Sequence, residues 1–257
     1  YSIRLSYRCT KRLGFQYTWF SRYGNMEQIR IQGLCLSTLS VGEADLLLTL
    51  LTQEQGVIKI YARGIRRPSR RDQFAACRPG TVAEWLLRKG RSDLCNLDEV
   101  EVLYYPDALF ERWEQLHDVL AMFQAILDSQ WPGKPIPALY ALTLTFMRQA
   151  EIHWSPSLLP VFLLKVLVHE GVFPVPPHCE LCESSSHLWD WSPLGGLLCH
   201  LHGDPHSPLV SSQEELNRWT HMSSLRSFDA IRAVDISKTE VERLQKITAL
   251  LLGTLKL

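Results

Sequence analysis

Residues 45–63 of the chain are DLLLTLLTQEQGVIKIYAR, and this stretch decides the class of fold. An aliphatic run at 45–52 precedes a polar turn at 53–56, and apolar and polar side chains then alternate up to residue 63. Alternation with a period of two is typical of a strand with one buried face, and a short polar turn ending in Gly is typical of a hairpin. The stretch therefore predicts two antiparallel strands.

Three more strand patterns surround this hairpin, at 28–38, 81–87 and 94–103. No strongly periodic helix lies between them in the sequence. Short strands at such close spacing are typical of a small closed barrel. We therefore predict a five-stranded OB-fold β-barrel that spans residues 26–105.

After Pro106 the apolar side chains recur at intervals of three and four residues, which indicates a helix that ends before Trp131. We expect its buried face to be one apolar stripe. The stripe consists of Leu109, Trp113, Leu116, Leu120, Phe123 and Leu127.

Four further helices are predicted in the second half of the chain. One spans 137–151, and the next follows Ser155 and ends near Gly171. The last two begin at capping boxes, in which a Ser side chain and a Glu three residues later satisfy the first N–H groups of a helix. The capping pairs are Ser212 with Glu215 and Ser237 with Glu240.

A helix-poor interval between these helices contains the strongest chemical signal. Cys179 and Cys182 are followed by Cys199 and His202, a spacing typical of structural zinc sites. His200 and His206 compete as the fourth ligand, and buried cysteines without a metal are the plainer alternative. We predict one structural Zn²⁺ per chain. A deaminase-type catalytic zinc is disfavoured because none of His117, His153 and His169, which lie ahead of the cysteine pair, has a Glu two residues on.

The predicted fold class is therefore α+β with more than one domain. The five-stranded OB-fold β-barrel at 26–105 is followed by an α-helical domain at 106–257, which contains a zinc-ribbon-like insert at about 178–207.

The formal net charge of zero hides an uneven distribution of charge. Residues 59–91 contain ten cations and two acids, whereas residues 92–257 contain 11 cations and 21 acids. The acids at 93–101 are interpreted as a solvated face. In the connection at 64–71 four arginines follow Gly64, and we expect its Gly and Pro residues to prevent a helix.

The basic segment predicts a surface that binds nucleic acid, although a run of charge is often only a solvated surface. In the strand up to residue 63, Lys59, Tyr61 and Arg63 share one face, where an aromatic ring between two cations suits stacked nucleotides. A later hairpin brings more cations to the same side. The predicted DNA-binding residues are Lys59, Tyr61, Arg63, Arg66, Arg67, Arg70, Arg71, Arg88, Lys89 and Arg91.

Other classes of protein are disfavoured. No run of about 18 apolar residues exists to span a membrane. The seven cysteines are an odd number and are scattered except for the last three, which favours a reducing compartment. No phosphate-binding loop or nucleophile motif is found, and no catalytic residue is proposed, so we expect a protein that is not an enzyme. Residues 1–25 carry five cations and no acid, and we expect them to be an extension outside the fold, with Met26 as the natural start.

The combination resembles the RecO family of bacterial recombination mediators. The resemblance rests on GEADLLLTLLT at 42–52, on ARGIRR at 62–67 and on RKGRSDL at 88–94. In the second half, 177–182 and WSPLGGLLC at 191–199 resemble the zinc-bearing segment of the family. The chain departs from the family pattern at Gly80, where the family has an aromatic residue, and at His202, where the family often has Cys.

The resemblance implies a DNA repair and recombination mediator of the bacterial cytoplasm that associates with the nucleoid. Such a protein binds single- and double-stranded DNA, anneals complementary strands and, with RecR, assists the loading of RecA onto DNA coated by single-strand-binding protein. The family also implies that the C-terminal tail of single-strand-binding protein docks on the helical domain and that RecR contacts the barrel.

Two alternatives remain from the residues alone. The first is a zinc-ribbon OB-fold factor of transcription or translation that binds RNA on Lys59, Tyr61 and Arg63. The second is a zinc hydrolase or deaminase, which the four-ligand spacing disfavours.

Overall fold

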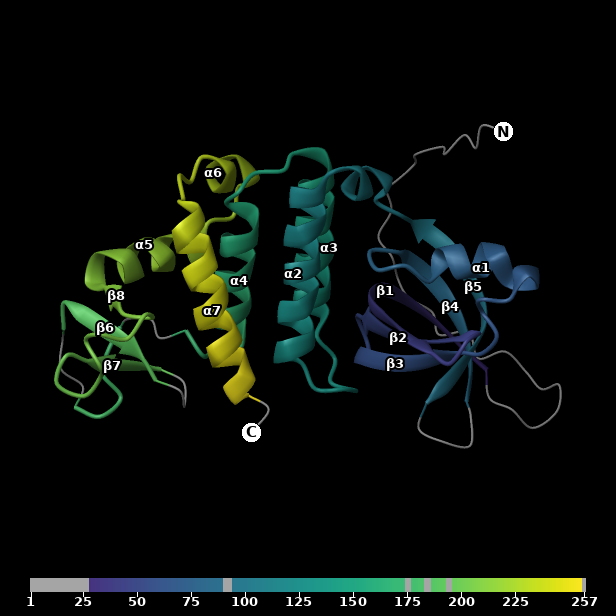
Figure 1. Ribbon diagram of the computed structural model, residues 1–257, viewed down its shortest axis with the longest axis horizontal. Helices are drawn as coiled ribbons and strands as arrows, with labels where there is room; N and C mark the ends of the chain where they lie inside the picture. The colour runs from purple at the N-terminus through teal and green to yellow at the C-terminus, as the bar shows by residue number, and fades with distance from the viewer. Residues whose placement is uncertain (1–27, 90–93, 174–176, 183–185, 193–195, 256–257) are drawn as a thin grey trace.

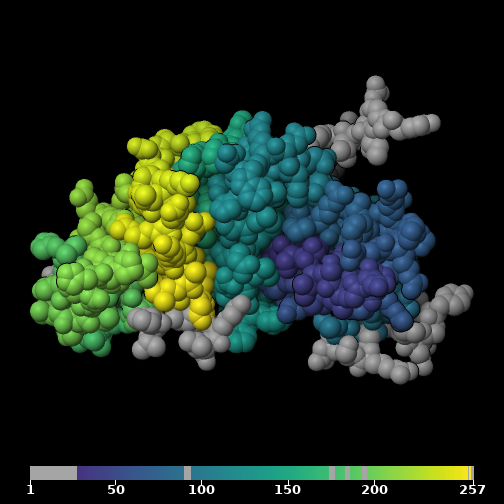
Figure 2. Space-filling view, in the orientation of Figure 1, coloured from purple at the N-terminus to yellow at the C-terminus, as the bar shows by residue number. Residues whose placement is uncertain are grey.

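The computed structural model describes residues 28–89, 94–173, 177–182, 186–192 and 196–255. Three regions follow one another along the long axis of the molecule (Figure 1): a β-barrel, a group of upright helices and a small three-stranded sheet. The surface shows the same succession, with α7 between the barrel and the sheet (Figure 2). The predicted extension at 1–25 and the predicted contact Arg91 lie outside the described residues.

Five strands form a closed barrel in the order β1-β2-β3-β5-β4, which confirms the predicted OB-fold. The predicted hairpin is present, since β2 and β3 are antiparallel and Thr52 lies opposite Gly56. β5 pairs with β3 over a short parallel stretch, and β4 pairs with β1, which closes the barrel. The strands are β1 (Gln28–Val41), β2 (Asp45–Thr52), β3 (Gly56–Ala62), β4 (Val82–Lys89) and β5 (Cys95–Tyr104).

The barrel encloses an apolar core of its own. Leu46, Leu48 and Leu50 of β2 and Ile60 and Ala62 of β3 belong to this core, whereas Lys59 beside Ile60 is exposed. Trp85 of β4 fills the interior, and its indole N–H donates to the carbonyl oxygen of Gly33 on β1 at 3.0 Å. The inner residues of the barrel therefore form a buried apolar cluster separate from that of the helices.

The connection between β3 and β4 contains a helix, so the prediction of a helix-free segment at 64–71 was wrong. Pro68–Arg70 form the 3-10 turn η1, and α1 (Arg71–Ala76) follows directly. Pro68 occupies the beginning of the turn, where a fixed φ angle suits a helix and the missing N–H costs nothing.

The predicted helices of the second half are present. Ser212 and Ser237 are the N-caps of α5 and α7, and their hydroxyls accept from the backbone N–H groups of Glu215 at 3.1 Å and of Glu240 at 3.2 Å. The short helix α6 had no sequence signal. The elements are η2 (Asp107–Glu111), α2 (Trp113–Ser129), α3 (Pro137–Ile152), α4 (Leu158–His169), α5 (Gln213–Ser224), α6 (Phe228–Arg232) and α7 (Lys238–Thr254).

The predicted apolar stripe was correct for Leu109 and Phe123, which are buried, but wrong for Trp113 and Leu120. Trp113 is 73% exposed and Leu120 is 40% exposed, whereas Val119, Met122 and Ile126 are buried. The helix is interrupted at Arg112, so Leu109 belongs to η2 and its spacing does not fix the phase of α2. Val119, Met122 and Ile126 form a second apolar stripe of the same period, and packing against α4 and α7 selects it.

A continuous apolar core joins the end of the barrel to the helices. Leu34, Leu51 and Val57 of the barrel belong to the same buried cluster as the faces of α2, α3 and α4. Gly56 has a φ of +63°, and a Cβ there would lie 1.9 Å from the carbonyl oxygen of Lys134, so only glycine allows this approach. The barrel is thus fixed against the helices.

The small sheet lies at the far end of the molecule from the barrel (Figure 1). It consists of β6 (Leu188–Trp191), β7 (Leu197–Cys199) and β8 (Ser211–Ser212), in the order β7-β6-β8. Trp191 stacks on Trp219 of α5, with ring centroids 6.5 Å apart, so the sheet packs on the helical core. Among the described helices, none has both the length and the apolar character that crossing a membrane requires.

Candidate nucleic-acid and metal sites

Residues 63–67, which we name the arginine turn, follow directly after β3. Ile65 points into the barrel and is fully buried, whereas Arg63, Arg66 and Arg67 are exposed. The backbone N–H of Arg66 donates to the carbonyl oxygen of Ala44 at 3.0 Å, which ties the turn to the connection between β1 and β2. Gly64 has a φ of +62°, a conformation that suits glycine. The turn thus presents three guanidinium groups from a fixed backbone.

A carboxylate also anchors this turn. Asp45 accepts from the backbone N–H of Gly64 at 2.6 Å, and its other oxygen accepts from the hydroxyl of Tyr61. The Tyr61 hydroxyl, the Gly64 N–H and the nearby Arg63 and Arg67 together lower the pKa of Asp45. Asp45 is therefore ionised, and the Tyr61 side chain is held at its hydroxyl end.

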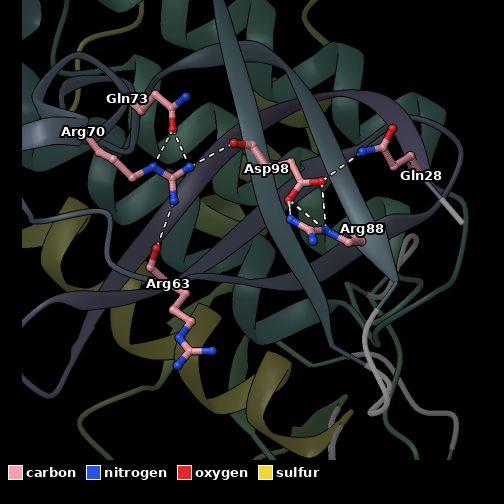
Figure 3. A network of polar contacts seen from close by, with 6 residues as sticks. All are labelled: Gln28, Arg63, Arg70, Gln73, Arg88 and Asp98. Atoms are coloured by element: carbon pink, nitrogen blue, oxygen red, sulfur yellow. Dashed lines mark hydrogen bonds and ion pairs between the residues drawn. The ribbon is translucent and has the colours of Figure 1, made fainter. Parts of the chain in front are cut away.

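Arg70 turns its guanidinium group into the protein (Figure 3). It donates to the carbonyl oxygens of Arg63 and Asp98, each at 2.9 Å, and its Nε donates to Gln73 Oε1, also at 2.9 Å. These three partners belong to the arginine turn, to β5 and to α1. Arg70 therefore joins three segments that are separate in the sequence.

Arg88 of β4 is likewise engaged within the protein. Its Nε donates to both carboxylate oxygens of Asp98 at 3.0 Å, and a second nitrogen forms an ion pair with the same group. Gln28 of β1 donates to Asp98 Oδ2 at 3.1 Å. Asp98 thus connects three strands through its side chain and Arg70 through its backbone oxygen (Figure 3).

The predicted DNA-binding residues fall into two groups. Lys59, Arg63, Arg66, Arg67, Arg71 and Lys89 are exposed, and Tyr61 is half-buried. Arg70 and Arg88 make the internal contacts described above. Within the described parts of the chain, no hydrogen bond or ion pair involves the charged groups of Lys59, Arg63, Arg66, Arg67 or Arg71.

Sequence reasoning missed the residues that build this surface. Asp98 was interpreted as part of a solvated face, but only 13% of its side chain is exposed and it pairs with Arg88. Asp45 and Gln73 had no assigned role. Arg70 and Asp98 come close together only when the barrel closes, so no local sequence pattern predicts their contact.

The four predicted metal ligands meet at one point. The ligand atoms of Cys179, Cys182, Cys199 and His202 all lie within 4.8 Å of one another. Sγ of Cys182 and Sγ of Cys199 are 3.7 Å apart, and His202 Nδ1 lies 3.5 Å and 3.3 Å from the sulfurs of Cys179 and Cys199. A tetrahedral zinc site with Zn–S near 2.3 Å has S···S edges of about 3.8 Å and S···N edges of about 3.6 Å. The three separations given above are close to these edges, and all pairs of ligand atoms lie within 4.8 Å.

Local backbone contacts prepare this cluster. The N–H groups of His202 and Gly203 donate to the carbonyl oxygen of Cys199 at 2.9 Å and 2.8 Å, which forms a tight turn at the end of β7. Burial alone would raise the pKa of Cys179, but backbone N–H groups of Cys199, Leu181 and Cys182, together with His202, lower that pKa to about 6. The site therefore favours a thiolate, the form of Cys that binds metal.

The competing histidine His200 lies outside this cluster. Its Nδ1 lies 3.2 Å from the hydroxyl oxygen of Ser186. Neither His200 nor His206 belongs to the group of ligand atoms found among the described residues. The geometry therefore favours His202 as the fourth ligand.

Comparison with known proteins identifies the family. The family model described as "Recombination protein O N terminal" matches residues 26–106, which contain the whole barrel. The DNA repair protein RecO of Desulfitobacterium hafniense is 30% identical over 199 residues, which are 75% of this chain and 69% of that protein. The chain belongs to the RecO family. The resemblance found in the sequence is thereby confirmed.

Two further RecO relatives show how far the similarity extends. The DNA repair protein RecO of Exiguobacterium sibiricum is 29% identical over 223 residues, 84% of this chain and 86% of its own. That of Chlamydia pneumoniae is 28% identical over 189 residues, 73% and 74% of the two chains. The similarity to RecO proteins thus continues beyond the barrel into the second half of the chain.

Proposed function

We propose that the chain is a non-enzymatic mediator of DNA repair and recombination that binds single- and double-stranded DNA and anneals complementary strands. Membership of the RecO family supports the role in repair. The observation that favours DNA binding most is the arginine turn, in which three exposed guanidinium groups project from a backbone that is fixed on both sides. With RecR, the protein assists the loading of RecA onto DNA coated by single-strand-binding protein.

The physical requirement for annealing is simple. Two phosphate backbones must be neutralised while their bases stay free to pair, and this needs exposed cations but no reacting group. Lys59, Arg63, Arg66, Arg67 and Arg71 supply five such cations. Five phosphate contacts on single-stranded DNA predict a slope of about −3.5 in a plot of log binding constant against log salt concentration.

We propose that the two halves of the chain bind different partners. Residues 26–105 are the DNA-binding domain, on which RecR also docks. The helical domain at 106–257 has an excess of acids, which repels DNA and leaves this half to the C-terminal tail of single-strand-binding protein. The proposed location is the cytoplasm, at the nucleoid.

An annealing assay with complementary oligonucleotides tests this function. The variant Arg63→Ala, Arg66→Ala, Arg67→Ala removes three exposed cations from the barrel. The matched control Arg226→Ala, Lys238→Ala, Lys246→Ala removes the same charge from exposed positions of the helical half. We expect the barrel variant to lose annealing, with and without single-strand-binding protein, and the control to anneal as the unmodified protein does.

Several outcomes would overturn the proposal. No annealing by the unmodified protein removes the function, and equal annealing by both triple variants removes the basic surface. Tighter binding to an RNA strand than to a DNA strand of the same sequence would favour the RNA-binding alternative instead.

We also propose that Cys179, Cys182, Cys199 and His202 bind one structural zinc ion per chain. Three separations between the ligand atoms are close to the edges of a tetrahedron around zinc, and the four residues supply four ligand atoms. Bound zinc would cross-link the turn at Cys179 to the end of β7. The insert at about 178–207 would then be braced without a core of its own.

A further inference from the structure

The arginine turn is stabilised from two directions. On one side Ala44 and Asp45 accept from the backbone of the turn, at 3.0 Å and 2.6 Å. On the other side Arg70 donates to the carbonyl oxygen of Arg63, and Ile65 between them is buried in the barrel. Arg70 thus contacts the backbone of the first residue of the turn, while the Arg63 side chain points away from it (Figure 3).

The contacts of Arg70 occupy its guanidinium group. Nε and one terminal nitrogen donate to Gln73 Oε1, the same terminal nitrogen donates to the Asp98 carbonyl oxygen, and the other donates to Arg63. A planar guanidinium with five donors reaches three acceptors in different directions, which a lysine ammonium on a flexible stem does not reproduce. The group is therefore used as a structural fork.

We propose that Arg70 is a positioning residue for DNA binding: with Gln73 and Asp98 it fixes the arginine turn so that Arg63, Arg66 and Arg67 face the phosphate backbone together, and it does not bind phosphate itself. This inference rests on the proposed function. A turn that is ordered before DNA arrives loses less conformational entropy on binding, and binding is tighter for that reason.

The neighbouring network extends the same device. Asp98 accepts from Arg88 and Gln28 with its carboxylate while its carbonyl oxygen accepts from Arg70. Arg88 lies at the end of β4, next to the exposed Lys89. The network thus connects the arginine turn to the end of β4, where Lys89 is exposed.

The test uses variants that remove the contacts of Arg70 without a change of net charge. Arg70→Lys keeps the charge and removes the planar group with its several donors, and Gln73→Leu removes the acceptor without a change of charge. The matched control is Arg226→Lys, the same exchange at an exposed position of the helical half. Binding of the whole protein to a fluorescent poly-thymidine oligonucleotide is measured by anisotropy at several salt concentrations. Thermal unfolding of each variant is followed in parallel.

We expect Arg70→Lys to weaken binding about tenfold, since charged hydrogen bonds hold the turn. The salt slope should also become shallower by more than about 0.7, the contribution of one phosphate, because several contacts weaken together. Gln73→Leu should weaken binding about fivefold through the loss of the same contacts. In the double variant the two effects should not add, because both act through one interaction. Arg226→Lys should bind DNA as the unmodified protein does, since this position lies in the helical half and keeps its charge.

Contrary results are distinguishable. If Arg70→Lys and Gln73→Leu bind with the affinity and slope of the unmodified protein, Arg70 does not position the turn. If Arg70→Lys does not fold, Gln73→Leu alone decides between the two outcomes. Failure of the proposed function has another signature: the unmodified protein itself would then bind weakly or with a slope near zero.

Discussion

The two ends of the molecule fix short loops by different means (Figure 1). In the barrel, the arginine turn is stabilised by a carboxylate, backbone carbonyls and a buried Ile65, on top of an apolar core that includes Trp85. In the insert, a pair of turns converges on three cysteines and His202. The large apolar residues of the insert, Trp189 and Trp191, belong to the core of the helices.

This difference predicts how each end responds to damage. A barrel with its own core can lose a surface contact and remain folded, so changes there alter binding. The insert has two strands of four and three residues among its described residues and no separate core, so we expect its order to depend on the ligands. Changes at the cysteines should therefore alter folding locally.

The largest expected effect is the loss of the proposed zinc site. Cys179→Ser should reduce the zinc content from one ion per chain to almost none and unfold the insert, since structural zinc contributes about 10 kcal/mol or more to small sites. Elemental analysis measures the metal, and hydrogen exchange at residues 186–192 measures the unfolding. Strand annealing by the barrel should persist.

His206→Ala is the matched control, since His206 lies in the same region but outside the group of four ligand atoms. It should retain one zinc ion. Full zinc content in Cys179→Ser, or unfolding of the barrel along with the insert, would remove the contrast between the two ends.

A second prediction concerns the core of the barrel. Trp85→Ala should lower the free energy of unfolding by about 3–5 kcal/mol, because a fully buried indole leaves a large cavity. Denaturant unfolding measures the loss, and the zinc content should not change. A loss below about 1 kcal/mol would mean that Trp85 does not fill the barrel as described.

Local signals in the sequence predicted most of the fold. Alternation placed the strands, and the capping boxes at Ser212 and Ser237 placed two helix starts, because both patterns depend only on neighbouring residues. The spacing of Cys179, Cys182, Cys199 and His202 likewise predicted the group that the structure brings together.

The failures involve choices that only the tertiary structure makes. The helix α2 offers two apolar stripes, and packing selects the one that contains Val119 instead of Leu120. Arg70 and Asp98 are 28 residues apart in sequence, so their contact could not be predicted from neighbouring residues. Arg70 was therefore predicted to bind DNA, and Asp98 was predicted to be solvated. Closure of the barrel makes them partners.

A smaller change in stability is expected at the helix caps. Ser212→Ala and Ser237→Ala should each lower the free energy of unfolding by about 1 kcal/mol, since each removes an acceptor for the first turn of a helix. Ser212 also pairs with Leu188 in the small sheet. Hydrogen exchange at residues 188–191 should therefore accelerate in Ser212→Ala only. Equal acceleration in both variants would indicate that the insert responds to the helices as a whole.

The smallest expected effect is a change in pH dependence at the arginine turn. The Tyr61 hydroxyl and the Gly64 N–H lower the pKa of Asp45 in the folded protein. A carboxyl group with a lowered pKa stabilises the fold above its unfolded pKa of about 3.9, and this contribution is lost as the pH falls through the folded pKa. Asp45→Asn should therefore be less stable than the unmodified protein at neutral pH, and the difference should shrink below about pH 4.

Denaturant unfolding of the two proteins between neutral and acidic pH measures this difference. A difference that stays constant with pH would mean that Asp45 acts through its shape and not its charge. If Asp45→Asn also binds DNA more tightly, the main effect of the carboxylate on binding is electrostatic repulsion of the phosphates. If Asp45→Asn binds DNA more weakly although it has lost a negative charge, the anchored backbone of the turn matters more for binding than one unit of charge. This dependence on a backbone held by hydrogen bonds distinguishes the arginine turn from the insert, where metal ligands hold the turns.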